Sequence, residues 1–167
     1  MIRGCEESDI PTIDSIINEA ARVYRGAIPE DCWHEPYMSR AELLDEMAAG
    51  VKFCGWDERG ILLGVMGVQD VREFTLIRHA YVKPAQQGRG IGGELLKTLI
   101  DQASRPILIG TWAAAKWAIG FYRKHGFELA ESEETLRLLA RYWRIPPRQR
   151  EASVVLYQRG AMKQLLD

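Results

Sequence analysis

Apolar side chains recur along the chain at the spacings of amphipathic helices. The apolar face of the first predicted helix is made of Ile10, Ile13, Ile16, Ile17, Ala20 and Ala21. These positions repeat every three or four residues, as one face of a helix does. We expect Asp9 to cap this helix, with Pro11 in its first turn. A second helix is predicted from Ser39, which has capping-box spacing to Glu42, as far as Gly50.

Strands are predicted where apolar and β-branched residues form short runs. The predicted strands cover residues 2–5, 51–57, 61–68, 73–82, 107–110 and 153–157. The run 61–68 is nearly all apolar, which is typical of a strand covered on both faces. Asp57-Glu58-Arg59-Gly60 has the composition of a hairpin turn.

Three more helices are predicted in the second half of the chain. The apolar set of the first is Ile91, Leu95, Leu96, Leu99, Ile100 and Ala103. The next helix ends at Gly126 as its C-cap. The last carries one stripe of Leu136, Leu139, Ala140 and Trp143 and is stopped by Pro146-Pro147. Early hairpins and later strand–helix–strand units together predict an α/β fold.

Composition narrows the function classes. A chain of 167 residues suits a single domain spanning 1–167. A net charge of −1 gives no general attraction for nucleic acid or an anionic membrane, so we expect neither as a partner. Cys5, Cys32 and Cys54 are an odd number without CxxC spacing, which favours free thiols in a reducing cytoplasm over disulfides or a metal site. No apolar run approaches the roughly 18 residues of a membrane span.

A glycine-rich stretch joins a predicted strand directly to a predicted helix. Gly88, Gly90 and Gly93 allow positive φ and close backbone approach, and the first N–H groups of the helix lack internal partners. Such a turn suits a phosphate or pyrophosphate, and Arg89 can add a charged contact. These glycines also match G-x-G-x-x-G, but no acidic residue follows the next strand to hold a ribose. A P-loop is excluded because no Lys-Ser/Thr pair follows the glycines.

Two ordered motifs resemble those of the GNAT superfamily of N-acyltransferases. Gln87, Gly90 and Gly92 match that family's Q/R-x-x-G-x-G/A motif. The segment 118–127, Ala-Ile-Gly-Phe-Tyr-Arg-Lys-His-Gly-Phe, matches its A-x-x-F/L-Y-x-K-x-G-F signature. The gap between the motifs suits one helix and one strand. The resemblance covers residues 2–127, and the last 40 residues less securely.

The resemblance implies a mixed central sheet, splayed between its fourth and fifth strands, with helices on both faces. It also implies acetyl-CoA, or another short acyl-CoA, as acyl donor, with no metal. The residues it assigns to coenzyme binding are Ala80, Tyr81, Val82, Gln87, Gly88, Arg89, Gly90, Ile91, Gly92 and Gly93. The chain departs from the family at Ala115, where many members carry an asparagine, and in an extra helix over residues 133–144.

Acyl transfer to an amine needs a proton acceptor for the amine and a donor for the leaving thiolate. Within the second motif, Tyr122 is the candidate acid, and the competing interpretation is a packed aromatic. His79 is the candidate base, because imidazole titrates near neutral pH. His34, Glu35 and proton removal through water remain alternatives.

The acceptor is predicted to be a small-molecule or peptide amine. The segment between the first two helices, where the family usually forms its acceptor pocket, carries Trp33, Glu35 and Tyr37, a combination of acid and aromatics that suits an amine. The arginines at 137, 141, 144, 148 and 150 fit a solvated face, a site for a carboxylate or a contact with an acidic patch of a partner. A homodimer is expected as the commonest assembly.

Three function classes stay open at this point. An N-acyltransferase is favoured by the intact Tyr122. A non-catalytic acyl-CoA sensor gains slight support from Ala115. A nicotinamide-dependent oxidoreductase rests only on the glycine pattern.

Overall fold

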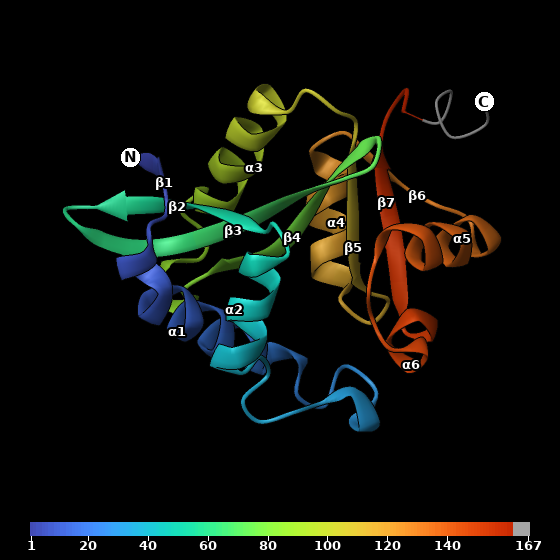
Figure 1. Ribbon diagram of the computed structural model, residues 1–167, viewed down its shortest axis with the longest axis horizontal. Coiled ribbons are helices and arrows are strands. Elements are labelled where there is room, and N and C mark those ends of the chain that lie inside the picture. The colour runs from blue at the N-terminus through green and yellow to red at the C-terminus, as the bar shows by residue number, and fades with distance from the viewer. Residues whose placement is uncertain (162–167) are drawn as a thin grey trace. The chain divides into compact units, whose positions relative to one another are not determined.

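A computed structural model of the chain describes residues 1–161 (Figure 1). Its elements in chain order are β1 (Ile2–Gly4), η1 (Glu7–Asp9), α1 (Ile10–Ala20), η2 (Ala21–Tyr24), η3 (Glu30–Cys32), α2 (Arg40–Ala48), β2 (Lys52–Glu58), β3 (Ile61–Val71), β4 (Phe74–Val82), η4 (Pro84–Gln86), α3 (Ile91–Gln102), β5 (Ile107–Trp112), α4 (Lys116–Lys124), β6 (Phe127–Leu129), α5 (Ser132–Tyr142), α6 (Pro147–Glu151) and β7 (Ser153–Gln158). The strand order is β1-β2-β3-β4-β5-β7-β6. Helix α3 connects β4 to its neighbour β5, the crossover typical of parallel strands. The predicted α/β class with a mixed sheet is therefore confirmed, while the splay stays a prediction.

The described residues form two compact units. The first unit comprises Met1–Val23, His34–Asp70 and Ile77–Gln102. The second comprises Tyr24–Trp33, Val71–Leu76 and the described residues from Ala103 onward. The prediction of one domain over residues 1–167 stays a prediction, and its last six residues lie outside the described part.

The first unit is built on antiparallel strands. Ile2 pairs with Trp56, and Lys52 pairs with Val68, so β2 lies between β1 and β3. The predicted turn between β2 and β3 is present. Arg59 and Gly60 both have positive φ, +57° and +83°, as a two-residue hairpin turn requires. The Oδ1 atom of Asp57 accepts the Gly60 N–H at 2.7 Å.

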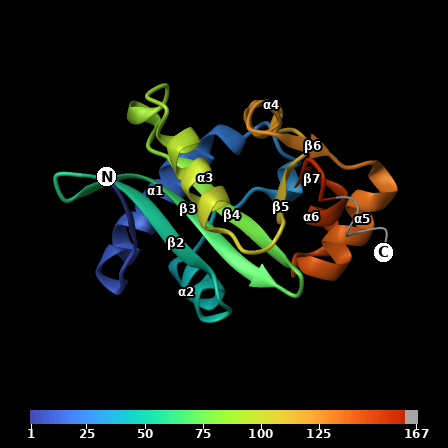
Figure 2. The ribbon, with the colours of Figure 1, turned by 90° about the horizontal axis from the view of Figure 1, so that it is seen from above.

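Helices cover both faces of these strands. Helices α1 and α2 pack on one face through a core of Ile13, Ile16, Ile17, Met38, Leu43, Val51, Phe53, Leu62 and Val65. Figures 1 and 2 show α3 on the opposite side of β3 and β4. A Cβ added to Gly64 would lie 2.9 Å from Cγ2 of Ile91, so α3 approaches β3 very closely. The apolar face predicted for α1 is confirmed, because its members from Ile13 onward are buried.

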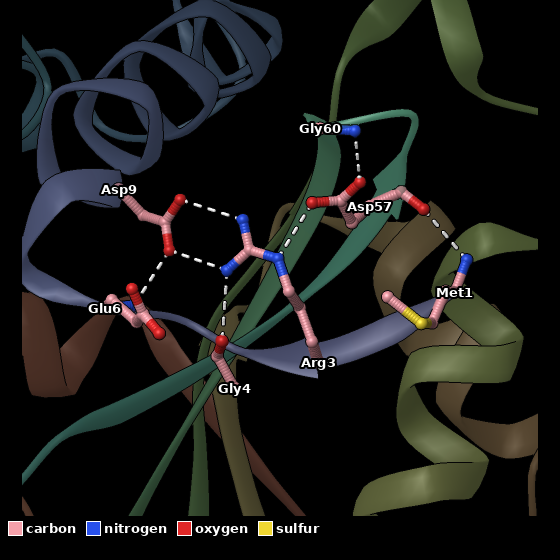
Figure 3. Close-up of polar contacts among 7 residues, drawn as sticks. All are labelled: Met1, Arg3, Gly4, Glu6, Asp9, Asp57 and Gly60. Carbon is pink, nitrogen blue, oxygen red and sulfur yellow. Dashed lines mark hydrogen bonds and ion pairs between the residues drawn. The ribbon is translucent and has the colours of Figure 1, made fainter.

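Charged side chains tie β1 to its surroundings (Figure 3). Arg3 donates to Asp57 at 2.8 Å and to both carboxylate oxygens of Asp9 at 2.8 and 2.9 Å. Asp9 also accepts the backbone N–H of Glu6 at 2.7 Å. Helix α1 begins at Ile10, but the Asp9 side chain makes no capping bond to it. Asp9 therefore occupies the predicted N-cap position, with Pro11 in the first turn, but its side chain binds Arg3 and Glu6 instead of the helix. Ser39 does cap α2, accepting the Glu42 N–H at 3.1 Å.

The second unit places β7 between β5 and β6, antiparallel to both. Helix α5 packs on one face through Phe74, Leu76, Leu108, Ala130, Leu138, Leu139, Tyr142, Trp143, Val155 and Tyr157. Helix α4 packs on β6 through Tyr122 and Phe127, whose ring centroids lie 6.2 Å apart. Gly126, at φ +89°, follows the end of α4 as predicted.

Two predictions for the C-terminal region are wrong in part, and one strand was missed. The buried stripe of α5 is Thr135, Leu138, Leu139 and Tyr142. Of the predicted stripe, Leu139 and Trp143 are buried, whereas Leu136 is 52% exposed. The helix ends at Tyr142, before the two prolines, and Pro147 instead begins α6. Strand β6 was not anticipated, since three residues are too few to display an alternating pattern.

Candidate functional site

The glycine-rich turn has the backbone geometry of an anion site. Gly88 and Gly90 have φ of +82° and +80°, a region that side-chain-bearing residues rarely adopt. A Cβ added at either position would meet no atom within 4 Å, so this backbone faces open space. Ile91, the first residue of α3, is only 2% exposed and packs the first turn of the helix against the sheet. The free N–H groups of that turn thus lie beside an open, exposed loop, which fits a phosphate group.

Arg89, the cation of the turn, is held by an acidic partner. Its Nη2 lies 2.8 Å from Oε1 of Glu58, at the end of β2, and it also donates to Gln86. The hydrogen bond from Arg89 lowers the pKa of the Glu58 carboxyl below its usual value. Both side chains are nearly half exposed, 44% and 46%, so the pair contributes little to stability. Arg89 can therefore exchange this carboxylate for another anion at small cost.

His79 lies in β4 with an unusual backbone conformation. Its φ is +52°, which in a strand is the mark of a local kink. The imidazole stacks on Phe53 with ring centroids 6.2 Å apart. Its Nε2 makes a short hydrogen bond with Oε2 of Glu46, on α2. The kink thus turns the ring toward α2 and the acidic residue there.

Glu46 is bound by both Arg78 and His79. Its Oε1 accepts from Arg78 at 3.2 Å, and Arg78 also donates to Gln69 at 3.0 Å. Gln69 in turn donates to the carbonyl of Ala49, just past α2, at 3.1 Å. Burial alone raises the pKa of Glu46, but the hydrogen bond from His79 and the charges of His79 and Arg78 outweigh it, so the pKa lies below its usual value. Glu46 is therefore ionised at neutral pH.

The remaining residues assigned to the coenzyme continue this strand and turn. Ala80, Tyr81 and Val82 are half-buried at the end of β4, and Tyr81 packs against the core of α1 and α2. Gln87 donates from Nε2 to the carbonyl of Val82 at 3.4 Å. Gly92 and Gly93 lie in the first turn of α3. All ten predicted coenzyme residues thus lie in the first unit.

Tyr122 lies on α4 in the second unit. Its ring packs against Phe121 at 5.2 Å and Phe127 at 6.2 Å, and only 6% of the residue is exposed. Burial, with a smaller effect from Tyr24, raises the pKa of the Tyr122 hydroxyl. The group therefore keeps its proton at neutral pH, as a general acid must. Ala115, fully buried, is the residue before α4.

The residues predicted to bind the acceptor are divided between the units. Trp33 ends η3 in the second unit, whereas Glu35 and Tyr37 belong to the first. Tyr37 packs on the core of α1 and α2, and Glu35 is exposed. Asn18 of α1 holds this segment: its side chain accepts the N–H of Met38 and donates to the Met38 carbonyl, both at 2.9 Å.

The structure therefore brings His79 and the glycine-rich turn together within one unit, and it carries Tyr122 and Trp33 on the other. Sequence reasoning missed Glu46, Arg78 and Asn18. Glu46 lies 33 residues before His79 on a polar helix, where no local pattern marks a charged partner. For Asn18, an amide at the border of the apolar face of a predicted helix was the available signal.

The chain belongs to the acetyltransferase (GNAT) family, whose profile matches residues 13–127. Both motifs and the strand–turn–helix geometry lie within that range.

Two curated relatives are similar over part of their length. The L-amino acid N-acyltransferase MnaT of Escherichia coli is 33% identical over 107 residues, 61% of this chain and 62% of that protein. The L-methionine sulfoximine/L-methionine sulfone acetyltransferase of Salmonella typhimurium is 31% identical over 109 residues, 62% of this chain and 63% of that protein. The match thus spans somewhat under two thirds of each relative.

Solved structures share the fold. The PaiA N-acetyltransferase of Thermoplasma acidophilum, in complex with coenzyme A, superposes with a TM-score of 0.70 at 18% identity, over 95% of this chain and 97% of that one. Within residues 1–161, no three or more His, Cys, Asp or Glu side chains are arranged to hold a metal ion. Nor does any helix of this part have the length and apolarity to cross a membrane.

Proposed function

We propose that the protein is an N-acyltransferase that moves an acetyl or other short acyl group from acyl-CoA to an amine by direct attack. The observation that carries this proposal is the exposed turn at the start of α3, with Gly88 and Gly90 at positive φ in open space. Membership of the GNAT family supports it, as does the named activity of the two relatives.

The turn would hold the pyrophosphate of acyl-CoA. The backbone N–H groups of residues 88–92 supply donors, and the dipole of α3 favours negative charge there. Arg89 would leave Glu58 for a phosphate oxygen, trading one exposed ion pair for another. The half-buried backbone of 80–82 would bind the pantetheine arm.

The acyl donor supplies a thioester whose carbonyl is attacked by the amine. Before the attack, the ammonium acceptor must lose a proton to the chain, because only the neutral amine has a free electron pair. The chain must then stabilise an oxyanion and protonate the leaving sulfur, while the attacking nitrogen loses a second proton as the amide forms. His79 is proposed as the proton acceptor, a backbone N–H near the kink of β4 as the oxyanion donor, and Tyr122 as the proton donor. The neutral phenol of Tyr122 suits that last role.

We propose a small amino acid as the acceptor, attacked through its α-amino group. Both curated relatives are named for amino-acid substrates. Glu35 and Tyr37, on the segment held by Asn18, would contact the ammonium group. A homodimer and a cytoplasmic location stay predictions.

The test is release of free coenzyme A thiol from acetyl-CoA with a panel of L-amino acids, methionine sulfone and short peptides. Turnover with at least one amino acid, with the acylated product identified by mass, supports the proposal. Saturable acetyl-CoA binding without thiol release from any amine overturns it in favour of an acyl-CoA sensor. Release only with peptides keeps the reaction but overturns the acceptor class.

A further inference from the structure

We infer that Glu46 is a positioning residue for His79, and that the two side chains act as one proton-accepting pair for the acceptor amine. This inference rests on the proposed function, since it identifies the device that makes His79 a base. The sequence contains no motif for it, and the pair exists only because α2 packs on the kinked part of β4.

The geometry determines which imidazole nitrogen can react. The hydrogen bond to Oε2 of Glu46 uses Nε2. An ionised carboxylate only accepts hydrogen bonds, so Nε2 must carry the proton in the neutral ring. Nδ1 is then the nitrogen that holds a lone pair. Phe53 stacks against the ring and limits its rotation about the bond to Glu46.

The carboxylate is itself fixed in place. Arg78 bonds to Oε1 of Glu46 while His79 bonds to Oε2, so the two oxygens have different partners. The side chains of Arg78 and His79 are each only 13% exposed, which keeps water from screening them. The charged groups bonded to the ring or to its carboxylate partner are Glu46 from α2 and Arg78 from β4. Phe53 of β2 and Gln69 of β3 add no charge.

The backbone conformation gives a second reason to assign a function to this pair. A non-glycine residue at φ +52° is in a strained backbone conformation. The bonds of His79 and Arg78 to one carboxylate offset this strain, because they hold consecutive residues of the kink to α2. Strained conformations of this kind concentrate at functional sites.

The proton balance is simple. An N–H bond of the ammonium acceptor breaks, its proton passes to Nδ1, and the electron pair stays on the amine nitrogen. The ring becomes an imidazolium and Glu46 remains a carboxylate, so the pair changes from a net charge of −1 to neutral. The proton later leaves to solvent when the ring returns to its neutral form.

The experiment compares four variants with the wild type: Glu46→Gln, Arg78→Gln, His79→Gly and, as control, Asp45→Asn on the exposed side of the same helix as Glu46. Proton uptake by His79 is followed by NMR of its ring C–H protons, assigned by their loss in His79→Gly. The pH dependence of kcat/KM for the amino acid is measured in parallel. Glycine tolerates the positive φ, so His79→Gly removes the ring and keeps the kink.

Glu46→Gln and Arg78→Gln should shift the His79 titration in opposite directions. Glu46→Gln removes the anion that stabilises the imidazolium, so the His79 titration and the acidic limb of kcat/KM should both move to lower pH. Arg78→Gln removes a cation and should move both to higher pH. Asp45→Asn should move neither. Plateau activity should fall about tenfold or more in Glu46→Gln and at least 10²-fold in His79→Gly.

Several outcomes would overturn the inference. The pair is only a structural contact if the acidic limb of kcat/KM does not shift in folded Glu46→Gln. The same conclusion follows if Glu46→Gln and Arg78→Gln shift the limb in the same direction, or if His79→Gly keeps full activity. If Glu46→Gln fails to fold, the shift in Arg78→Gln decides alone: a shift to higher pH supports the inference, and no shift or a shift to lower pH overturns it. The NMR titration needs no turnover, so opposite shifts in a protein without transferase activity would overturn the proposed function and not the pair.

Discussion

At the scale of single residues, Tyr122 is the side chain whose role depends most on its surroundings. Phe121 and Phe127 pack its ring, and burial raises the pKa of its hydroxyl. The packing alone would suit a purely structural tyrosine. What distinguishes the two roles is the hydroxyl, which packing does not require.

Tyr122→Phe is expected to lower the single-turnover rate of acyl transfer by about 10²-fold or more, with acetyl-CoA affinity and stability little changed. The ring and its contacts survive, and only the proton donor is lost. Saturating acetyl-CoA with rapid mixing isolates this step from product release. Tyr157→Phe is the matched control, since that hydroxyl bonds to Glu128 on β6 at 3.1 Å. An unchanged rate in Tyr122→Phe would leave the tyrosine a packing residue.

At the scale of elements, the turn before α3 is proposed to set the affinity for acyl-CoA. Gly90→Val places a branched side chain at a position of positive φ and should keep the pyrophosphate from the backbone N–H groups of the turn. Each lost hydrogen bond to a charged group is worth roughly 1.5–3 kcal/mol, so the affinity for acetyl-CoA should fall by about tenfold or more. Calorimetric titration measures the affinity.

Gly160→Val, also at positive φ (+87°) and in open space, controls for backbone strain and should keep full affinity. Binding by Gly90→Val as tight as that of the control would place the pyrophosphate elsewhere.

The anchor between α1 and the acceptor segment is a second element-scale feature. Asn18→Ala removes both bonds to the Met38 backbone and should cost about 1–3 kcal/mol of unfolding free energy. If Glu35 and Tyr37 bind the acceptor, its KM should rise several-fold while acetyl-CoA affinity stays the same. Glu19→Ala, on the exposed side of the same helix, is the control. Equal losses for both substrates would mean that the segment does not form the acceptor site.

The elements also show where sequence reasoning succeeds. The α1 face and the turn before α3 were predictable because one local pattern determines each. For α5 the pattern was ambiguous: Leu136, Leu139, Ala140 and Trp143 have the same spacing as the buried set one residue earlier. The buried set includes Thr135 and Tyr142, whose hydroxyls bond to Ala130 and Glu73. Only tertiary contacts decide between the two stripes.

The same limit applies to the site. Gln87, Gly90 and Gly92 were recognisable because a turn needs particular residues at fixed spacing. Glu46 was not, since its partners His79 and Arg78 become neighbours only after α2 packs on β4. Long-range charge pairing leaves no periodic signal in the sequence.

At the scale of the whole molecule, acid stability depends on the carboxylates that hold β1. The hydrogen bond from Arg3, with a smaller contribution from the Glu6 N–H, lowers the pKa of Asp9 to about 2, against roughly 3.9 in an unfolded chain. A lowered folded-state pKa contributes stability that is present above about pH 4 and lost as pH falls toward 2.

Asp9→Asn should therefore be less stable than the wild type at pH 6, and the difference should shrink as pH is lowered to 2.5. Urea denaturation at pH 6, 4 and 2.5 measures it. Asp45→Asn controls for the loss of one carboxylate. A difference between Asp9→Asn and wild type that is constant with pH would mean that the Arg3–Asp9 pair does not contribute to folding.

The short strands β1 and β6 at the two ends of the strand order have a consequence for how copies of the chain meet. Each has only three residues. Arg3 of β1 is bound to Asp9 and Asp57, and Glu128 of β6 pairs with Arg159 at 3.3 Å. Short edge strands that carry charges are poor templates for intermolecular β-pairing. Concentrated protein should thus resist edge-to-edge aggregation, and any homodimer should form through helices or loops instead of a continuous intermolecular sheet.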